Sequence, residues 1–106
     1  MITARFVKKL GHFTSFSVSG HSGFAAQGED IVCAGVTACV QYALNLLDCF
    51  GSDGKSAIDA DVALIKYDLV LPCEYADKIV SVLHNEISYY ENLYPKFIKT
   101  EVLTDD

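Results

Sequence analysis

The chain begins with apolar and polar side chains in alternation, with the period of two that is typical of half-buried β-strands. We expect one strand over residues 2–9, a turn at Gly11 and His12, and a second strand over residues 13–20. One face of the second strand carries Phe16, Val18 and Gly20. The other face carries a polar row that continues past the strand end, namely Ser15, Ser17, Ser19 and His21. His21 is therefore expected at a strand end that faces solvent.

The period changes to that of a helix after a short loop that contains glycine. Asp30 is a favoured N-cap residue, so we expect a helix that begins at Ile31 and holds Cys33 in its first turn. Counting from Cys33 at helical spacing yields the only polar stripe of this helix: Thr37, Gln41, Asn45 and Asp48. Cys39 points elsewhere, among valine, alanine and leucine side chains. The pattern predicts a mostly buried helix with one narrow strip open to a groove.

The second half of the chain again alternates strands with a helix. We expect a turn-rich connection over 50–57, strands over 58–65 and 66–71, a helix over 74–94 and a last strand over 96–104. The order ββαββαβ predicts a single-domain α/β sandwich over residues 1–106. In this fold two helices pack on one mixed, mostly antiparallel sheet.

The helix over residues 74–94 carries two apolar lines. The core stripe at helical spacing consists of Ala76, Ile79, Val80, Leu83, Ile87, Tyr90 and Tyr94. The second line, on a neighbouring face, consists of Tyr75, Val82, Tyr89 and Leu93. A monomer would leave this second line partly exposed. It therefore predicts either an interaction surface, such as a homodimer seam, or a helix that lies deep between the sheet and a loop.

Net charge and hydropathy narrow the classes of partner. The net charge is −6 and the eight basic residues are scattered, which excludes direct binding of nucleic acid. An acidic surface suits a basic peptide substrate, although solubility alone explains the charge equally well. No uninterrupted apolar run reaches the length of about 18 residues that spans a bilayer, and the chain start lacks a signal-peptide core. We expect a cytoplasmic protein without a membrane partner.

The four cysteines predict free thiols rather than disulfides or a metal site. Their spacings contain no Cys-X-X-Cys element, and a cytosolic compartment is reducing. A zinc site built from His21, Cys33 and two distant residues is the disfavoured alternative. Asp59 and Asp61 are expected to face solvent from a strand, because no calcium-type glycine loop follows them. No cofactor is expected.

Cys33 and His21 are the candidate chemical groups. A helix start favours the thiolate over the thiol, and a histidine brought alongside would act as the base. The alternative is that Cys33 is a small, inert core residue. The intervening loop, residues 22–29, contains Gly23, Phe24 and Gly28, a composition typical of mobile catalytic loops. We expect it to act as a lid, with Phe24 either touching substrate or packing on the rim.

These residues also carry a family resemblance. The segments GHS at 20–22 and GEDIVCAGVT at 28–37 resemble the ribosomal-processing cysteine protease family, Prp, whose pattern is Gly-His-Ala, a short loop, then Gly-X-Asp-Ile-Val-Cys-Ala-(Ala/Gly)-Val-Ser. Ser22 stands where alanine is usual, and Thr37 where serine is usual. The resemblance implies a cytoplasmic endopeptidase that removes an N-terminal extension from a large-subunit ribosomal protein. It matches His21 and Cys33 to the catalytic pair and Asp30 to the aspartate before the nucleophile.

We therefore expect a cysteine endopeptidase with a Cys33–His21 dyad. Asp30 and Thr37 are candidate supporting residues, and Asp30 is either an orienting residue or only the helix cap. The small residues Ser19, Ser22 and Ala34 are expected to leave room for the bulky, aromatic side chains that the resemblance implies beside the cut. The competing class is a non-enzymatic peptide- or ribosome-associated binding module with an incidental thiol. Acyl or thiol transfer through the same dyad also stays open.

Overall fold

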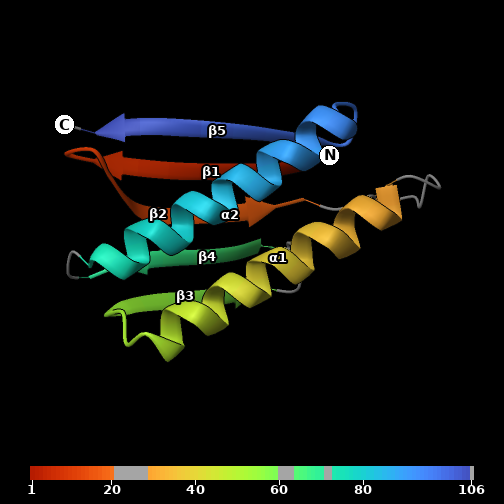
Figure 1. The fold of residues 1–106 in the computed structure, drawn as a ribbon. Helices are drawn as coiled ribbons and strands as arrows, with labels where there is room; N and C mark the ends of the chain where they lie inside the picture. The colour runs from red at the N-terminus through yellow and green to blue at the C-terminus, as the bar shows by residue number, and fades with distance from the viewer. Residues whose placement is uncertain (21–28, 60–63, 71–72, 106) are drawn as a thin grey trace.

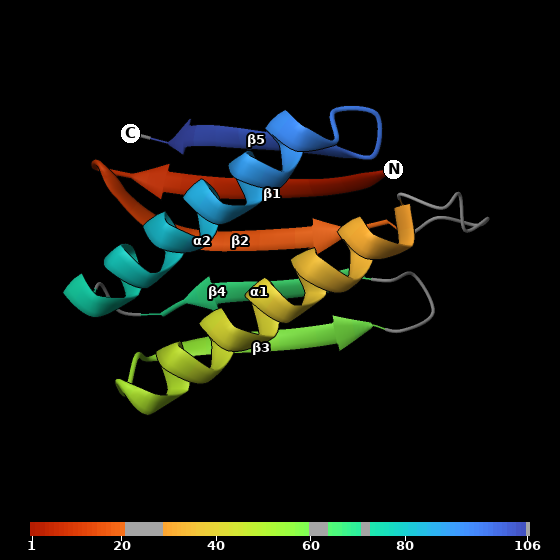
Figure 2. The ribbon, with the colours of Figure 1, turned by 45° about the vertical axis from the view of Figure 1, so that its right-hand side comes forward.

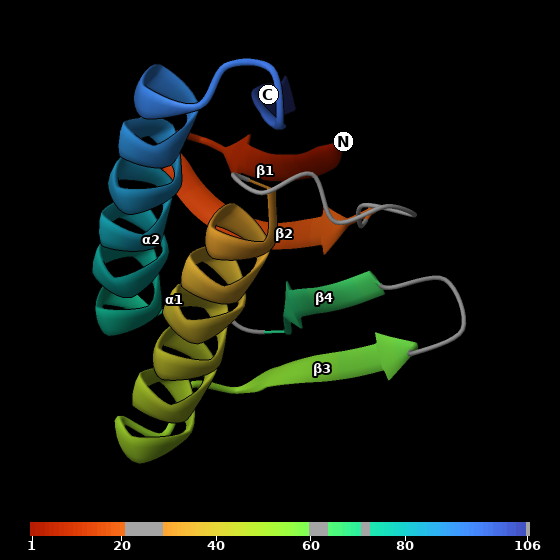
Figure 3. The same ribbon diagram turned by 90° about the vertical axis from the view of Figure 1, so that its right-hand side faces the viewer.

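The computed structural model describes residues 1–20, 29–59, 64–70 and 73–105. In chain order the elements are β1 (Ile2–Lys9), β2 (His12–Ser19), α1 (Glu29–Cys49), β3 (Gly54–Asp59), β4 (Leu64–Leu69), α2 (Glu74–Leu93) and β5 (Ile98–Asp105). The strands form a 5-stranded sheet in the order β3-β4-β2-β1-β5, and both helices cover one face of it (Figures 1 and 3). The predicted order of elements and the predicted two-layer arrangement are confirmed.

The hairpin of β1 and β2 is closed by a two-residue turn and contains a bulge. Leu10 and Gly11 both have positive φ angles, of 53° and 82°, as the tight turns of twisted hairpins require. The register shifts between Val7 and Lys8, because Ser15 pairs with Val7 while Phe13 pairs with Lys8. Thr14 is thus the extra residue, and Phe13 is buried on the same face as Phe16. The uninterrupted alternation predicted for this strand is wrong at this point.

The remaining strands make the sheet mixed. β5 pairs parallel with β1, whereas β4 pairs antiparallel with both β2 and β3. The single strand predicted over residues 58–65 is wrong, because β3 ends at Asp59 and β4 begins at Leu64. β3 lies at the sheet edge and almost all of its residues are exposed, so it lacks the alternation that would reveal it in the sequence.

The two helices bury apolar stripes against the sheet. On α2 the buried residues are Ala76, Val80, Leu83 and Ile87, which confirms the centre of the predicted core stripe. On α1 they are Val32, Val36, Val40, Ala43 and Leu47. By length and composition Val32–Cys49 would also suffice to cross a bilayer, but here its valines and leucines pack on the sheet. More of α1 is exposed than predicted, since Ala34, Ala38 and Tyr42 also face outwards.

The helices lie side by side across the sheet, and α1 runs diagonally from the end of β2 towards β3 (Figure 2). Gly35 permits their close contact, because a side chain at this position would press against the ring and hydroxyl of Tyr90 on α2.

A carboxylate ties the start of β2 to the first turn of α2. Asp77 accepts the Phe13 N–H at 2.8 Å, and its other oxygen lies 3.1 Å from Nδ1 of His12. Partial burial raises the pKa of Asp77, but these two hydrogen bonds and the nearby charges of His12 and Lys8 outweigh it and lower the pKa below the ordinary value. His12, predicted as a surface turn residue, is exposed but paired.

Candidate active site

Cys33 is a half-buried thiol near the start of α1. The helix begins at Glu29 rather than at Ile31, so Cys33 is its fifth residue and Asp30 its second. The prediction that Asp30 is the residue before the helix is therefore wrong, because Asp30 lies inside the first turn. The main-chain N–H groups without a partner within the helix are those of the first turn, residues 29–32. The positive end of the helix dipole still lies within one turn of the Cys33 thiol.

Cys33 lines a cavity of about 310 Å³ at the end of the sheet where β2 ends. Two members of the predicted polar stripe, Thr37 and Gln41, lie on the same cavity wall. The predicted shared face of Cys33, Thr37 and Gln41 is thereby confirmed over two helical turns. Asn45 and Asp48, farther along the stripe, are exposed and do not line the cavity.

The rest of the cavity surface is mainly apolar and comes from β1, β2, β3 and β4, from Gly20 just after β2, and from Val36 on α1. These residues are Ile2, Val18, Gly20, Val36, Ile58, Asp59, Leu64 and Ile65. Ile2, Ile58 and Ile65 are not among the site residues predicted from the sequence. No local pattern would have shown them, because they come together only through the order of the strands.

Gly20 carries the chain from β2 out towards the loop. Its φ angle is 94°, a conformation that other residues rarely adopt, and a methyl group on it would overlap the Met1 carbonyl oxygen. His21 follows directly and lies outside the described residues, as do Ser22, Gly23, Phe24 and Gly28. The position of His21 relative to Cys33 and the lid role of the loop therefore remain predictions.

Ser19 and Ala34 are described, and neither is among the residues that line the cavity. Ser19 is the last residue of β2 and pairs with Thr3 and Leu64 in the sheet. Ala34 is exposed on α1. Their role in substrate binding stays a prediction.

The other three thiols occupy different surroundings. Cys39 lines a groove between α1 and α2, where burial and the neighbouring charge of Glu86 raise the pKa of its thiol. Cys49 is exposed at the end of α1, and Cys73 precedes α2. All four cysteines are free, as predicted. Cys39 is held in the protonated, poorly nucleophilic form, whereas Cys33 opens onto a cavity beside a helix start.

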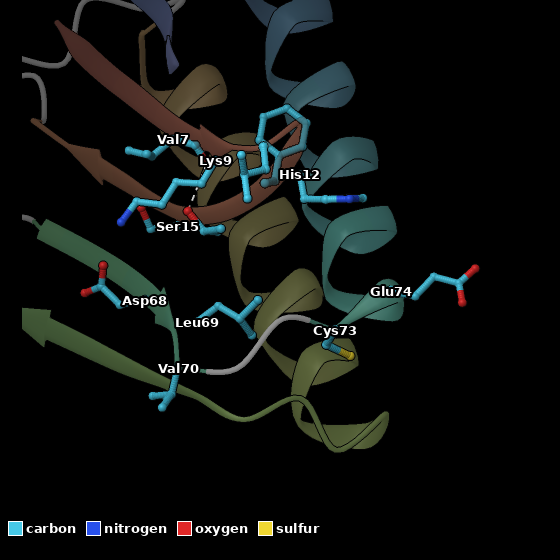
Figure 4. A pocket seen from close by; sticks show the side chains of 12 residues that line it. Val7, Lys9, His12, Ser15, Asp68, Leu69, Val70, Cys73 and Glu74 are labelled. Carbon is cyan, nitrogen blue, oxygen red and sulfur yellow. Dashed lines mark hydrogen bonds between the residues drawn. The ribbon is translucent and has the colours of Figure 1, made fainter. Parts of the chain in front are cut away.

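A second cavity, of about 770 Å³, lies at the opposite end of the sheet. Figure 4 shows His12 and Cys73 at its α2 side, and Glu74 pointing away from it. The sequence patterns predict no role for this cavity. Within the described ranges, no three His, Cys, Asp or Glu side chains lie close enough to hold a metal ion.

Comparisons with known sequences point to one family. A family model described as "Cysteine protease Prp" matches residues 1–99 of this chain. A Mycoplasma pneumoniae protein named ribosomal processing cysteine protease Prp is 32% identical over 85 residues, which cover 80% of this chain and 83% of that protein. A Bacillus subtilis protein of the same name is 58% identical over 31 residues, which cover 29% of this chain and 28% of that protein.

Solved structures share the fold. SMU.848 from Streptococcus mutans superposes with a TM-score of 0.88 at 25% identity, covering 99% of this chain and 96% of that one. The essential ribosomal processing protease Prp from S. aureus, in complex with a covalently linked product peptide, superposes with a TM-score of 0.86 at 22% identity. That match covers 96% of this chain and 99% of the S. aureus chain.

Proposed function

Because this chain belongs to the cysteine protease Prp family, we propose that it is an endopeptidase that uses Cys33 as nucleophile and His21 as general base and acid. The observation that carries the proposal is the placement of Cys33. It is the one described thiol that lines a cavity together with Gly20, the residue before His21. This placement favours an enzyme over a binding module, because a thiol at a cavity wall next to a helix start is suited to attack.

In the proposed reaction, the Cys33 thiolate attacks the carbonyl carbon of the scissile peptide bond. The negative charge that develops on the carbonyl oxygen is stabilised by the N-terminal end of α1. His21, which carries the proton that it took from the Cys33 thiol, donates this proton to the leaving amine, and the acyl group stays on sulfur as a thioester. His21 then takes a proton from water, which hydrolyses the thioester and restores the thiol. Asp30 either orients His21 or adds negative charge to the first helical turn.

We propose that the substrate is the N-terminal extension of a large-subunit ribosomal protein. The support is the name of the M. pneumoniae relative, a ribosomal processing protease, together with the net charge of −6, which attracts a basic ribosomal tail. The apolar cavity residues Val18, Ile58 and Ile65 suit a large apolar side chain beside the cut. Such processing would take place in the cytoplasm, where free thiols persist.

We further propose that the protein forms a homodimer through the outer face of its helices. The predicted second apolar line of α2 is exposed along its whole length, at Tyr75, Val82, Tyr89 and Leu93. Val82 also borders the groove between the helices, across which Tyr42 is exposed. An apolar surface of this extent is typical of a protein interface.

Cleavage and its dependence on Cys33 test the function. The purified protein is incubated with a ribosomal protein that carries its N-terminal extension, and the products are weighed by mass spectrometry. Cys33→Ala should lower kcat/KM by about a thousandfold or more, because the covalent step is lost. Cys39→Ala is the control, because Cys39 lies on the same helix but faces the groove between α1 and α2. It should leave kcat/KM within a few-fold of wild type.

Three results would contradict the proposal. One is residual turnover of Cys33→Ala within about tenfold of wild type, since loss of a nucleophile costs much more. The second is equal inactivation by Cys39→Ala, which would indicate a general effect on α1. Third, if the wild-type protein binds the extended substrate without cutting it, the binding-module alternative is correct.

A further inference from the structure

The two edges of the sheet differ in how their outward main-chain groups are used. An edge strand presents a row of N–H and C=O groups that another chain could pair with. The edges here are β3 and β5 (Figure 1). They lie on opposite sides of the molecule, and only β3 reaches the cavity that holds Cys33, through Ile58 and Asp59.

The edge of β5 is blocked by a side chain of α2. Thr100 donates its N–H to Oε2 of Glu91 at 2.9 Å, and its hydroxyl donates to Oε1 of the same carboxylate. The Glu91 carboxylate therefore already accepts the outward-pointing N–H at the middle of β5, so this N–H is not available to another strand. Natural proteins often protect edges in this way against pairing with other chains.

The edge of β3 has no such cover from the described part of the chain. Just beyond the strand, the Val70 N–H donates to the Asp53 carbonyl at 2.7 Å. Because bonded and non-bonded pairs alternate along an antiparallel ladder, Lys55, Ala57 and Asp59 direct their main-chain groups to β4. The residues between them, Ser56 and Ile58, direct their N–H and C=O groups outwards.

The side chains of β3 place this open edge at the cavity. Ile58 pairs with Ile65 and Ser56 with Tyr67, so both lie on the face that the helices cover. Ile58 is 68% exposed and lines the cavity together with Cys33. A strand added outside β3 would lie at the usual spacing of about 4.8 Å, with alternate side chains directed to the cavity side.

We propose that the substrate peptide binds in extended form along the outer edge of β3, pairing its main chain with Ser56 and Ile58. This inference rests on the proposed function, because it makes β3 the strand that delivers the peptide bond to Cys33. Main-chain pairing holds a peptide whatever its side chains, while alternate side chains enter the apolar cavity. The occupant is therefore a peptide strand rather than a second copy of this chain.

Peptide main-chain methylation tests the pairing on the wild-type protein. A peptide that spans the extension and cut site of the ribosomal protein is made with one N-methyl group, moved one residue at a time. Only every second residue of a peptide strand directs its N–H towards the neighbouring strand. An N-methyl group at such a residue of the peptide should lower kcat/KM, whereas one at the residues between them should change kcat/KM little. Loss of one such bond typically corresponds to a factor of about three to ten.

A matched set of variants tests the strand. Ser56→Pro removes one outward N–H, which an edge strand tolerates, and should lower kcat/KM about tenfold with little change in melting temperature. Val102→Pro is the control on the other edge. The Val102 N–H points outwards from β5, because Val102 lies two residues after Thr100, whose N–H points outwards. Its loss should leave kcat/KM unchanged.

The outcomes separate this proposal from the function itself. If the wild-type protein does not cut the unmethylated peptide in a Cys33-dependent manner, the proposed function fails. If it cuts, but the methylated peptides show no alternation, the β3 proposal is overturned and the function stands, even where Ser56→Pro does not fold. The β3 proposal is likewise overturned if Ser56→Pro converts a dimer to a monomer at unchanged kcat/KM, because a second copy would then occupy the edge.

Discussion

Gly20 is the residue where main-chain geometry constrains the candidate site most directly. Its positive φ angle turns the chain out of β2, and its missing side chain leaves room for the Met1 carbonyl oxygen. Gly20 also lines the Cys33 cavity and precedes the proposed base. The geometry of this glycine therefore fixes the main chain at the cavity, directly before the proposed base.

Replacing Gly20 by alanine should destabilise the fold more than replacing Gly11 does. Both glycines have positive φ, but a methyl group on Gly11 meets no atom within 4 Å. Gly11→Ala should cost about 1 kcal/mol for the backbone conformation alone. Gly20→Ala should cost about 2–4 kcal/mol, because the overlap with Met1 must also be relieved. Denaturant unfolding of both variants measures the difference. If both variants lose the same free energy of unfolding, the close contact with Met1 does not contribute to stability.

At the scale of elements, Asp77 joins two segments that lie far apart in the sequence. Its carboxylate receives the Phe13 N–H next to the bulge of β2, while its backbone belongs to the first turn of α2. The pKa of Asp77 is lowered in the folded protein. The charged form therefore stabilises the fold above the unfolded-state pKa of about 3.9, and this stabilisation is lost as the pH falls through the lower folded-state pKa.

Asp77→Asn should lower the free energy of unfolding by about 1 kcal/mol at pH 7, because an amide replaces a charged acceptor. The difference from wild type should shrink below pH of about 4 and vanish once the wild-type carboxylate is protonated. Denaturant unfolding at a series of pH values measures this. Asp53→Asn removes an exposed carboxylate and controls for net charge. A difference that stays constant as the pH falls would contradict the electrostatic role of Asp77.

The elements that sequence reasoning predicts well are those with one buried face. On α2, Ala76, Val80, Leu83 and Ile87 recur at helical spacing, so both the helix and its core face follow from the pattern. β3 carries no such pattern, because its residues are almost all exposed. The bulge at Thr14 depends on pairing between strands, which a single strand does not encode.

In the candidate site, too, one part follows from the sequence pattern and another part does not. The common face of Cys33, Thr37 and Gln41 follows from helical geometry and is predictable. The opposite wall, with Ile2, Ile58 and Ile65, depends on which strands become neighbours. Ile58 on β3 and Ile65 on β4 are separated from Ile2 on β1 by about half of the chain, and the strand order brings them to one wall.

At the scale of the whole molecule, the two outer faces of the sandwich differ in polarity. The outer face of the helices carries the exposed apolar line of α2. The uncovered face of the sheet carries polar and charged side chains, including Arg5, which donates to Glu101 at 3.1 Å. The contrast identifies the helical face as the proposed dimer surface.

Val82→Glu should therefore dissociate the dimer, because it places a charge in the middle of that surface. Val82 is 61% exposed in the single chain, so the substitution should leave the melting temperature of the monomer nearly unchanged. Leu103→Glu adds the same charge to the opposite face and should keep the dimer intact. Analytical ultracentrifugation of the three proteins measures the mass. A monomeric wild type, or a dimer that only Leu103→Glu disrupts, would contradict the proposed surface.

The contact between Met1 and Gly20 has a practical consequence for attaching other sequences to this protein. The N-terminus lies beside the cavity that holds Cys33, and Ile2 forms part of the cavity wall. The last strand instead ends at Asp105, which pairs with Lys9 at the far end of the sheet (Figure 1). An affinity tag or fused domain placed ahead of Met1 would compete with substrate for space around the cavity. The same tag placed after the final residue would leave the entrance clear, so the C-terminus is the end to use for purification, immobilisation or labelling.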